Sequence, residues 1–366
     1  MPDPLKNMYN HESISTLAAD IQQAYPPFQA DNFLLSVMDD TWDSLELKAR
    51  ARKITINLGK YLPPNYREAI AIIDKVVMNY SDSWLDGNFS MIFPDFVEVF
   101  GLDDWDTSIS ALERYTQYAS GEFAVRPFII NHEQRMMAQM YAWARHESNH
   151  VRRLACEGCR PALPWAQALP KFKKDPTPIL PILEQLKTDP CKWVRKSVAN
   201  NINDISKTHP DLVTRLAKEW YGQNEHTNWI VKHGCRTLLK KGNRDVLAIW
   251  GYDDVLSIDV HDFSLSVASI PIGESIPFSF AISSKDATKV RLEYGIDYVK
   301  SGGKTSRKIF KISETVLKEN GRKTYTKSHS FADVSVRKHY PGIHSVTLIV
   351  NGTQRGKLDF VLKEPM

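Results

Sequence analysis

The chain has few cysteines and no long apolar segment, and both absences narrow what it can be. Its 366 residues include only four cysteines, at positions 156, 159, 191 and 235. Because no secretory signal accompanies them, we expect reduced thiols and a cytoplasmic protein. No apolar run approaches the roughly 20 residues that a membrane helix needs, so we expect no association with a membrane.

A large excess of one charge is also missing, but the charges are unevenly distributed. The net charge is +4, yet residues 285–366 hold 17 Lys and Arg against 8 Asp and Glu, a balance of +9. The other 284 residues therefore carry −5. A basic C-terminal region indicates a polyanionic partner, and the alternative is a surface that is rich in lysine for solubility alone.

The spacing of apolar residues divides the chain into two regions. Up to about residue 250 they recur every three or four positions, as in "EAIAIIDKVVMNY", which predicts α-helices. Beyond Gly251 the segments are short, β-branched and aromatic, and "PIGE", "KENGRK" and "VNGTQ" separate them as turns. We therefore predict an all-α domain over residues 1–252 and an all-β immunoglobulin-like sandwich over residues 257–366.

A weak repeat runs through the second half of the helical region. Its copies are "VRRLACEGCR", "VRKSVANNIN" and a poorer "VKHGCRTLLK", which begin at Val151, Val194 and Val231. In each copy a valine precedes basic residues and then small and apolar residues. The spacings of 43 and 37 residues are typical of HEAT-like helical pairs, which stack into a solenoid.

Two short motifs suggest metal chemistry that their context argues against. "HESNH" at 146–150 matches the zinc-protease pattern H-E-x-x-H, which needs both histidines on one continuous helix. The repeat instead places Glu147 in the turn before a helix. "CEGC" at 156–159 falls inside a helix, where its thiols act as small apolar groups, and no second C-x-x-C completes a zinc site. We expect no metal and no other cofactor.

Polar residues of the repeat are predicted to share one face. Arg153, Glu157 and Arg160 stand at i, i+4 and i+7 of the first copy. The corresponding residues of the next two copies are Lys196, Asn200, Asn203, Asp204, Lys232, His233 and Arg236. Stacked repeats would align these residues into a groove that is basic at its mouth, with two carboxylates inside and with Trp165 and Trp193 near its ends.

Carboxylates in a basic groove need an explanation of their own. Basic side chains suit phosphates, which carboxylates repel, so an acid in such a groove implies a cationic target. An alkylated nucleobase is a target of that kind. The alternative is an ordinary solvated helix face with i, i+4 ion pairs that contribute roughly 0.3–0.5 kcal/mol each.

Four stretches of the chain resemble the AlkC family, DNA glycosylases that are related to AlkD and built on HEAT-like repeats. They are "LELKARARKITINLGKYLPPNYREAI" (45–70), "SGEFAVRPFI" (120–129), "WARHESNHVRRLACEGCRPALPWA" (143–166) and "DPCKWVRKSVANNINDISKTHPD" (189–211). The resemblance covers most of residues 1–250, and the last two stretches are its specific part. Some members of the family carry a C-terminal immunoglobulin-like domain, and this chain is similar to that subgroup.

The resemblance implies a function and a set of site residues. Such enzymes excise cationic N-alkylated bases, chiefly 3-methyladenine and 3-methylcytosine, from duplex DNA without full base flipping. The family's acidic residues fall on Glu122, Glu157 and Asp204, and its Arg and Trp residues on Arg153, Arg160 and Trp165. The repeat adds further expected DNA contacts at Trp193, Lys196, Asn200, Lys232, His233 and Arg236.

The chemistry expected of such a site is simple. A cationic base is a good leaving group, and a carboxylate can stabilise the oxocarbenium-like sugar or orient water. We see no lysine nucleophile, so we expect a monofunctional enzyme that leaves an abasic site. The expected partner is double-stranded DNA with alkylated bases, bound by a monomer that joins the nucleoid and needs no protein partner. The alternative is a non-catalytic HEAT-repeat scaffold that binds DNA or protein.

Overall fold

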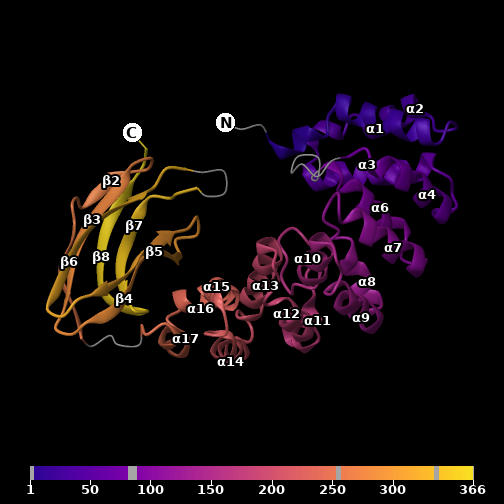
Figure 1. The fold of residues 1–366 in the computed structure, drawn as a ribbon. Helices are drawn as coiled ribbons and strands as arrows, with labels where there is room; N and C mark the ends of the chain where they lie inside the picture. Colours follow the sequence, from indigo (N-terminus) through magenta and orange to yellow (C-terminus); the bar gives the residue numbers. More distant parts are fainter. Residues whose placement is uncertain (1–3, 81–88, 253–256, 334–337, 366) are drawn as a thin grey trace. The chain divides into compact units, whose positions relative to one another are not determined.

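The computed structural model describes residues 4–80, 89–252, 257–333 and 338–365 (Figure 1). Residues 253–256, which separate the two predicted domains, lie outside the described residues. The chain forms two compact units, each described here by itself. The first unit comprises Met1–Thr208 and Asn224–Gly234, and the second comprises His209–Gln223 and Cys235–Met366.

The first unit is built from helices. Its α-helices are α1 (His11–Ala24), α2 (Ala30–Val37), α3 (Leu47–Tyr61), α4 (Tyr66–Val77), α6 (Ile92–Phe100), α7 (Trp105–Tyr115), α8 (Val125–Asn131), α9 (Glu133–Trp143), α10 (Asn149–Gly158), α11 (Pro170–Lys174), α12 (Leu180–Leu186), α13 (Lys192–Ile205) and α15 (Glu225–Gly234). Three 3-10 helices accompany them, η1 (Leu5–Met8), η2 (Trp42–Ser44) and η3 (Thr177–Ile179). None of the helices in the described ranges is both long and apolar enough to cross a membrane.

Helix α4 illustrates how the sequence specifies these elements. The side chain of Asn65 caps the helix by accepting hydrogen bonds from the backbone amides of Arg67 and Glu68. Ile70, Ile73 and other apolar residues at helical spacing are buried against the neighbouring helices. Burial of one apolar stripe per helix holds the stack together.

The repeat corresponds to three neighbouring layers of the first unit. Helix α10 packs on α13, and α13 packs on α15, with Val151, Val194 and Val231 all buried (Figure 1). The HEAT-like helical prediction is therefore confirmed. The third copy departs from the alignment, because α15 ends at Gly234 and Arg236 begins a separate helix that belongs to the second unit.

The second unit joins three helices to a β-sandwich. The helices are α14 (Pro210–Trp220), α16 (Arg236–Lys240) and α17 (Arg244–Ile249). The strands are β1 (Ile258–Leu265), β2 (Ser269–Pro271), β3 (Ser275–Ser284), β4 (Thr288–Val299), β5 (Thr305–Leu317), β6 (Gly321–Ser330), β7 (Gly342–Val350) and β8 (Thr353–Lys363). One sheet has the order β1-β3-β6, and the other has the order β2-β8-β7-β4-β5.

The sandwich core follows from alternation along the strands. In β3, Ile276, Phe278, Phe280 and Ile282 are buried, as the period of two requires for strands that face a core on one side. The predicted immunoglobulin-like sandwich is confirmed, and the predicted turns occur at Gly273, Asn320 and Asn351, each with a positive φ.

The helices of the second unit pack closely on the sandwich. A Cβ atom on Gly352, in the β7–β8 turn, would lie 2.6 Å from Leu247 Cδ1 and 2.7 Å from Gly242 Cα. Arg244 Nη2 donates a 2.7 Å hydrogen bond to Thr353 Oγ1. Because both glycines have positive φ angles and their backbones touch, glycine is required at each.

Candidate active site

Helix α10 presents the predicted polar face and buries the opposite one. Val151 and Leu154 are buried against the neighbouring layers, whereas the guanidinium of Arg153 stays half-buried at the edge of the helix. Gly158 lets α10 approach its neighbours, because a Cβ atom there would lie 2.5 Å from Val125 Cγ2. The face that holds Arg153 and Glu157 is therefore fixed by close packing behind it. Arg160 was predicted on the same helix face but lies two residues beyond the end of α10.

Arg160 joins acidic residues from two helices. Its Nη1 donates a 2.6 Å hydrogen bond to Glu157 Oε1 on α10, and its Nε donates a 2.9 Å bond to Asp204 Oδ2 on α13. Burial alone would lower the pKa of the Arg160 guanidinium, but the charges of Glu157 and Asp204 outweigh that effect and raise it. Arg160 is therefore a permanent cation that fixes both carboxylates.

Arg153 extends this chain of charges to a third carboxylate. Its Nη1 donates a 2.6 Å bond to Glu122 Oε2, in the turn before α8, and its Nη2 lies 3.8 Å from Glu157 Oε1. We call Glu122, Arg153, Glu157, Arg160 and Asp204 the carboxylate cluster. Residues from α10, the segment after it, α13 and a turn 31 positions upstream of Arg153 thus meet in one row of ion pairs, in which the Arg153–Glu157 contact is longer than a hydrogen bond.

The three carboxylates differ in their access to solvent. The exposed fraction of the side chain is 15% for Glu122, 7% for Glu157 and 2% for Asp204. Glu122 is therefore the acid that an incoming molecule can reach most easily. Glu157 and Asp204 are enclosed but satisfied by Arg160, as buried carboxylates must be.

Both predicted tryptophans are exposed. Trp193 contacts the carboxylate cluster, and Trp165 lies on the loop that follows α10. Trp193, at the start of α13, is 42% exposed, and the guanidinium of Arg153 lies 4.3 Å from the centroid of its ring. Trp165, in the segment between α10 and α11, is 71% exposed. Exposed indole rings of this kind offer stacking surfaces to a planar ligand.

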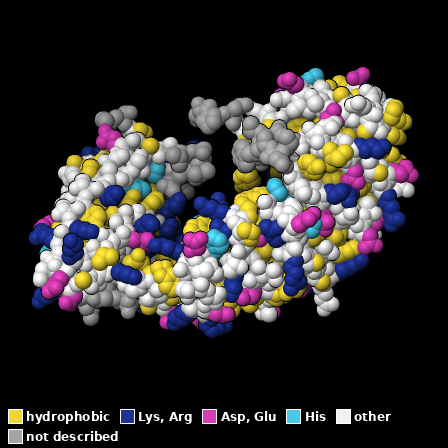
Figure 2. All heavy atoms as spheres, viewed as in Figure 1, with side chains coloured by type: hydrophobic (Ala, Val, Ile, Leu, Met, Phe, Trp, Pro, Cys, Tyr) yellow, Lys and Arg dark blue, Asp and Glu magenta, His cyan; other side chains and the backbone are white. Residues whose placement is uncertain are grey.

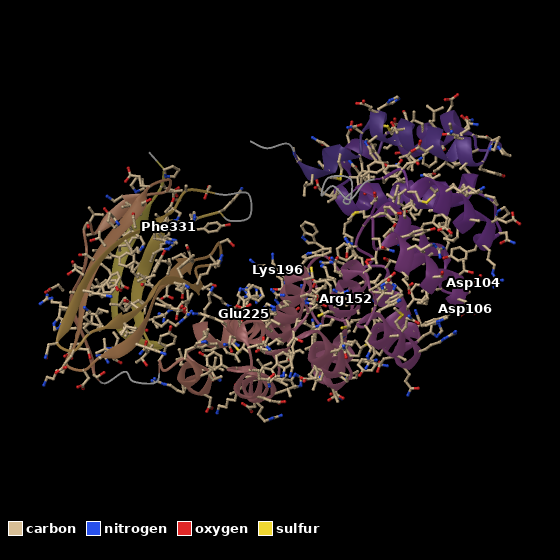
Figure 3. All side chains as sticks on the ribbon, in the orientation of Figure 1. Asp104, Asp106, Arg152, Lys196, Glu225 and Phe331 are labelled. Atoms are coloured by element: carbon tan, nitrogen blue, oxygen red, sulfur yellow. The ribbon has the colours of Figure 1, made fainter. Side chains whose placement is uncertain are left out.

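The remaining predicted contacts fall on two helices and a separate unit. Lys196 is exposed and Asn200 is half-buried on α13, and Figure 3 locates Lys196 there. Lys232 is exposed on α15, where the ring of His233 stacks on Trp229 at 5.1 Å. Arg236 belongs to the second unit, and its contact with DNA stays a prediction.

Several residues of the site were missed by the sequence analysis. Ser120 Oγ and Ser197 Oγ each donate a 2.5 Å hydrogen bond, to Glu122 Oε2 and to Glu157 Oε2 respectively. Lys207 Nζ donates a 2.8 Å bond to Asp204 Oδ1. Lys207 could have been found from its i+3 spacing to the acid. Ser197 could not, because its partner lies 40 residues away on another helix.

A second ion pair aligns the starts of the two helices that carry the cluster. Arg152, labelled in Figure 3, donates from Nε to Asp189 Oδ2 at 2.6 Å. Asp189 Oδ1 in turn accepts a bond from the backbone amide of Cys191, the residue before α13. The pair connects the beginning of α10 to the beginning of α13, which helps to set the register of the cluster.

The two metal-like motifs adopt other roles. His146 and Glu147 precede α10, which begins at Asn149, so the two histidines of "HESNH" do not share a continuous helix. Within the described ranges, no three His, Cys, Asp or Glu side chains are grouped to hold a metal ion. Cys156 and Cys159 are buried, and burial raises the pKa of the Cys156 thiol to about 12, which disfavours thiolate chemistry.

Comparisons with known proteins match both parts of the chain. A family described as "DNA alkylation repair enzyme" matches residues 118–238, which include the whole carboxylate cluster. A family described as "Uncharacterised protein YhaZ, C-terminal Ig-like domain" matches residues 259–364. The protein YhaZ of Bacillus subtilis (strain 168) is 48% identical over 356 residues, which cover 97% of this chain and 98% of YhaZ.

A solved structure resembles the whole chain. It is the Pseudomonas fluorescens alkylpurine DNA glycosylase AlkC bound to DNA containing an abasic site analogue. The two proteins are 34% identical, and the comparison covers 99% of this chain and 100% of the other with a TM-score of 0.94.

Proposed function

The chain belongs to the AlkC family of DNA alkylation repair enzymes, in the subgroup with a C-terminal immunoglobulin-like domain, and from this membership we propose that it is a DNA glycosylase. Its proposed substrates are cationic N-alkylated bases in duplex DNA, chiefly 3-methyladenine and 3-methylcytosine. The observation that carries the proposal is the carboxylate cluster, in which three acids from separate segments meet among guanidinium groups.

The chemistry of the lesion suits this arrangement. A base alkylated at N3 is already positively charged, so it leaves without a strong general acid. As the glycosidic bond stretches, positive charge develops on the deoxyribose, as in sugar hydrolysis. A carboxylate fixed beside the sugar stabilises that charge, and it can also orient or deprotonate the attacking water.

The three acids are proposed to divide this work according to their exposure. Glu122 is the most accessible, so we assign it to the sugar and the water. Glu157 and Asp204 are held by Arg160 and contribute a fixed negative field behind it. Trp165 and Trp193 are proposed to stack against the lesion or its neighbours without full flipping of the base.

The proposed enzyme is monofunctional and leaves an abasic site. Lys207 is the lysine that bonds to Asp204, and an ammonium that donates to a carboxylate is a poor nucleophile toward a sugar. Borohydride added during turnover should therefore trap no covalent protein–DNA adduct. An adduct that disappears in Lys207→Met would assign a lyase step to this lysine.

The proposed partner is double-stranded DNA, bound by a monomer in the cytoplasm and at the nucleoid. Lys196 and Lys232 are exposed on adjacent helices of the first unit and suit contacts with phosphates. In the second unit, β5 and β6 carry exposed lysines and arginines, and Figure 2 shows such side chains on the surface of the sandwich. These contacts position the duplex rather than read its sequence.

The deciding experiment measures excision on defined lesions. Duplexes with a single 3-methyladenine, 3-methylcytosine or 7-methylguanine are incubated with excess enzyme, and the released bases are separated by chromatography. We expect rapid release of the first two, and loss of release in Glu122→Gln but not in the control Glu147→Gln, an exposed acid before α10. Binding without release of any base would favour the non-catalytic scaffold.

A further inference from the structure

The segment between α10 and α11 holds Trp165 in an unfavourable backbone conformation. Trp165 has a φ of 64°, in the left-handed region that bulky residues rarely adopt. Such a conformation persists only where the surroundings hold it in place, and it is common at functional sites. The left-handed φ of Trp165, whose indole is exposed, therefore implies that other contacts hold its loop in place.

Arg126 supplies one of these contacts. This arginine of α8 is buried, and its Nη1 donates to the carbonyl oxygens of Gly158 at 2.9 Å and Arg160 at 3.0 Å. Its Nε donates to the carbonyl oxygen of Gln167 at 2.5 Å. Burial lowers the pKa of Arg126 to about 10, so it stays charged at neutral pH. One cation thus connects the end of α10 to the far side of the Trp165 loop.

Lys48 supplies the other contact, directly at Trp165. Its Nζ donates a 2.8 Å hydrogen bond to the carbonyl oxygen of Trp165, which lies 117 residues away in the chain. The same ammonium lies 4.3 Å from the ring centroid of Phe123, the residue after Glu122. Lys48 therefore contacts both of the loops that present accessible site residues.

The neighbouring charges leave Lys48 available for this role. Arg52, one turn further along α3, donates from Nη2 to Asp95 Oδ1 at 2.8 Å and to Glu98 Oε1 at 2.6 Å. The two acids of α6 are thus bound by the arginine. The ammonium of Lys48 is directed instead to a backbone carbonyl and an aromatic face, which orient it and fix the loop.

We infer that Lys48 is a positioning residue of the glycosylase: it holds the Trp165 loop in the left-handed conformation that presents the indole to damaged DNA. The inference rests on the proposed function for its effect on catalysis, but the clamp itself is a property of the free protein. A lysine that bound a phosphate directly would act on affinity for any duplex. A lysine that positions Trp165 acts on the excision step.

The first test separates these two roles by single-turnover kinetics. Lys48→Met should lower the excision rate at saturating enzyme at least about tenfold, because misplacement of a contact by about 1 Å can cost about a hundredfold. Its Kd for undamaged duplex should stay within about twofold of the wild-type value, as expected for a residue that binds no phosphate. Lys48→Arg, which keeps a charged donor, should restore part of the rate. Lys60→Met, at the other end of α3, removes an exposed lysine as a control.

A double substitution tests whether the effect passes through Trp165. In a Trp165→Ala background, Lys48→Met should change the excision rate by no more than about twofold, because the group that it positions is gone. A full loss in both backgrounds, together with a smaller salt dependence of DNA binding, would assign Lys48 to a phosphate contact and overturn the inference.

A measurement on DNA-free protein keeps this inference distinct from the proposed function. Hydrogen–deuterium exchange in Lys48→Met should rise in residues 161–169 and stay unchanged in Lys60→Met. Unchanged exchange in that segment would overturn the clamp even if the enzyme excises 3-methyladenine. Conversely, a wild-type protein that releases no base would refute the proposed function, while the exchange data would still decide the clamp.

Discussion

At the scale of single residues, Arg160 determines how the acids of the cluster are presented. Its guanidinium lies between Glu157 and Asp204, whose charges raise its pKa. Arg160 therefore stays charged in the folded protein. The two enclosed carboxylates are thereby fixed in orientation, and neither is left as an unpaired buried charge. Preorganised charges of this kind are effective because they need no rearrangement when the reaction proceeds.

Amide substitutions at the two enclosed acids should separate catalysis from binding. Glu157→Gln and Asp204→Asn keep an acceptor for Arg160 but remove the negative charge. We expect single-turnover excision to fall about 100-fold or more, while Kd for the damaged duplex changes far less. The free energy of unfolding should fall by about 1–3 kcal/mol, because each carboxylate is buried and hydrogen-bonded. Unchanged excision rates in both variants would remove these acids from the mechanism.

A buried histidine of the sandwich should make the second unit sensitive to acid. The Nε2 atom of His344 lies 3.0 Å from the carbonyl oxygen of Tyr340, and its ring packs beside Phe331 and Phe360. Burial lowers the pKa of His344 below 6.5, although the bond to Tyr340 opposes the shift. The unfolded chain therefore binds this proton more readily, so the stability that His344 contributes is present above about pH 6.5 and is lost below it.

The corresponding measurement is thermal unfolding of the full chain between pH 7.5 and 5.5. The transition that reports the sandwich should shift to lower temperature as the pH falls, and His344→Phe should reduce that shift. An identical pH dependence in the variant would show that other groups take up the proton.

Residue-scale predictions from sequence succeeded where the partners are close in the sequence. Spacing placed Arg153, Glu157 and Arg160 on one face, and the structure brings them into contact. Lys48 and Arg126 could not be predicted from spacing, because their partners are backbone carbonyls in distant segments. The assignment of catalytic roles within the cluster stays a prediction until variants are measured.

At the scale of elements, α10 depends on a glycine for its position. A Cβ atom at Gly158 would lie 2.5 Å from Val125 Cγ2 and 3.0 Å from Met140 Cε, so Gly158→Ala must push α10 away from α8 and α9. We expect a loss of about 1–3 kcal/mol in the free energy of unfolding, as for other overpacked cores. Excision should also fall, because α10 carries Arg153 and Glu157 and ends two residues before Arg160.

The control for this substitution is Gly302→Ala. No atom lies within 4 Å of a Cβ placed at Gly302, so its effect on stability should stay within about 0.5 kcal/mol. Denaturant unfolding of the two variants gives the comparison. Equal stabilities would mean that α10 tolerates the displacement and that its packing is looser than the structure indicates.

Helices and strands could be predicted from sequence where the apolar periodicity is strong. The prediction failed where strands are polar. The sequence analysis assigned the helical region, the strand region and three turns of the sandwich. The basic stretches "SGGKTSRK" (301–308) and "GRKTYTK" (321–327) suggest loops from sequence, but only residues 301–304 lie outside a strand, because β5 begins at Thr305 and β6 at Gly321. Both are edge strands, where charged residues are tolerated and the apolar alternation that identifies a strand is lost.

At the scale of the whole molecule, the basic edge of the sandwich should contribute to the salt dependence of DNA binding. Lys311 and Lys327 are exposed on β5 and β6. If each contacts one phosphate, the double variant Lys311→Gln/Lys327→Gln should lower the slope of log Kd against log salt by about 1.8. The double variant Lys60→Gln/Lys75→Gln, on exposed positions of α3 and α4, removes the same charge as a control. Equal slopes in the two variants would argue that the sandwich does not bind phosphates.

The boundary between the predicted domains is the whole-molecule feature that sequence reasoning is least able to locate. The change from helical to strand periodicity near residue 252 marks where the element type changes. It does not show which unit the last helices join, and the structure groups α14, α16 and α17 with the strands. The predicted ranges 1–252 and 257–366 stay a prediction for the limits of independently folding domains.

The contact of Gly242 and Leu247 with the β7–β8 turn limits where the chain can be divided. If the chain were divided near residue 252, where the periodicity changes, Leu247 would be separated from the β7–β8 turn that covers it. Both fragments would then expose a surface that is buried in the full chain. The sandwich is therefore not an independent module that can be exchanged without the helices before it. Removal of the sandwich would therefore have to include α16 and α17 or replace the contacts that Leu247 and Gly242 make with the β7–β8 turn.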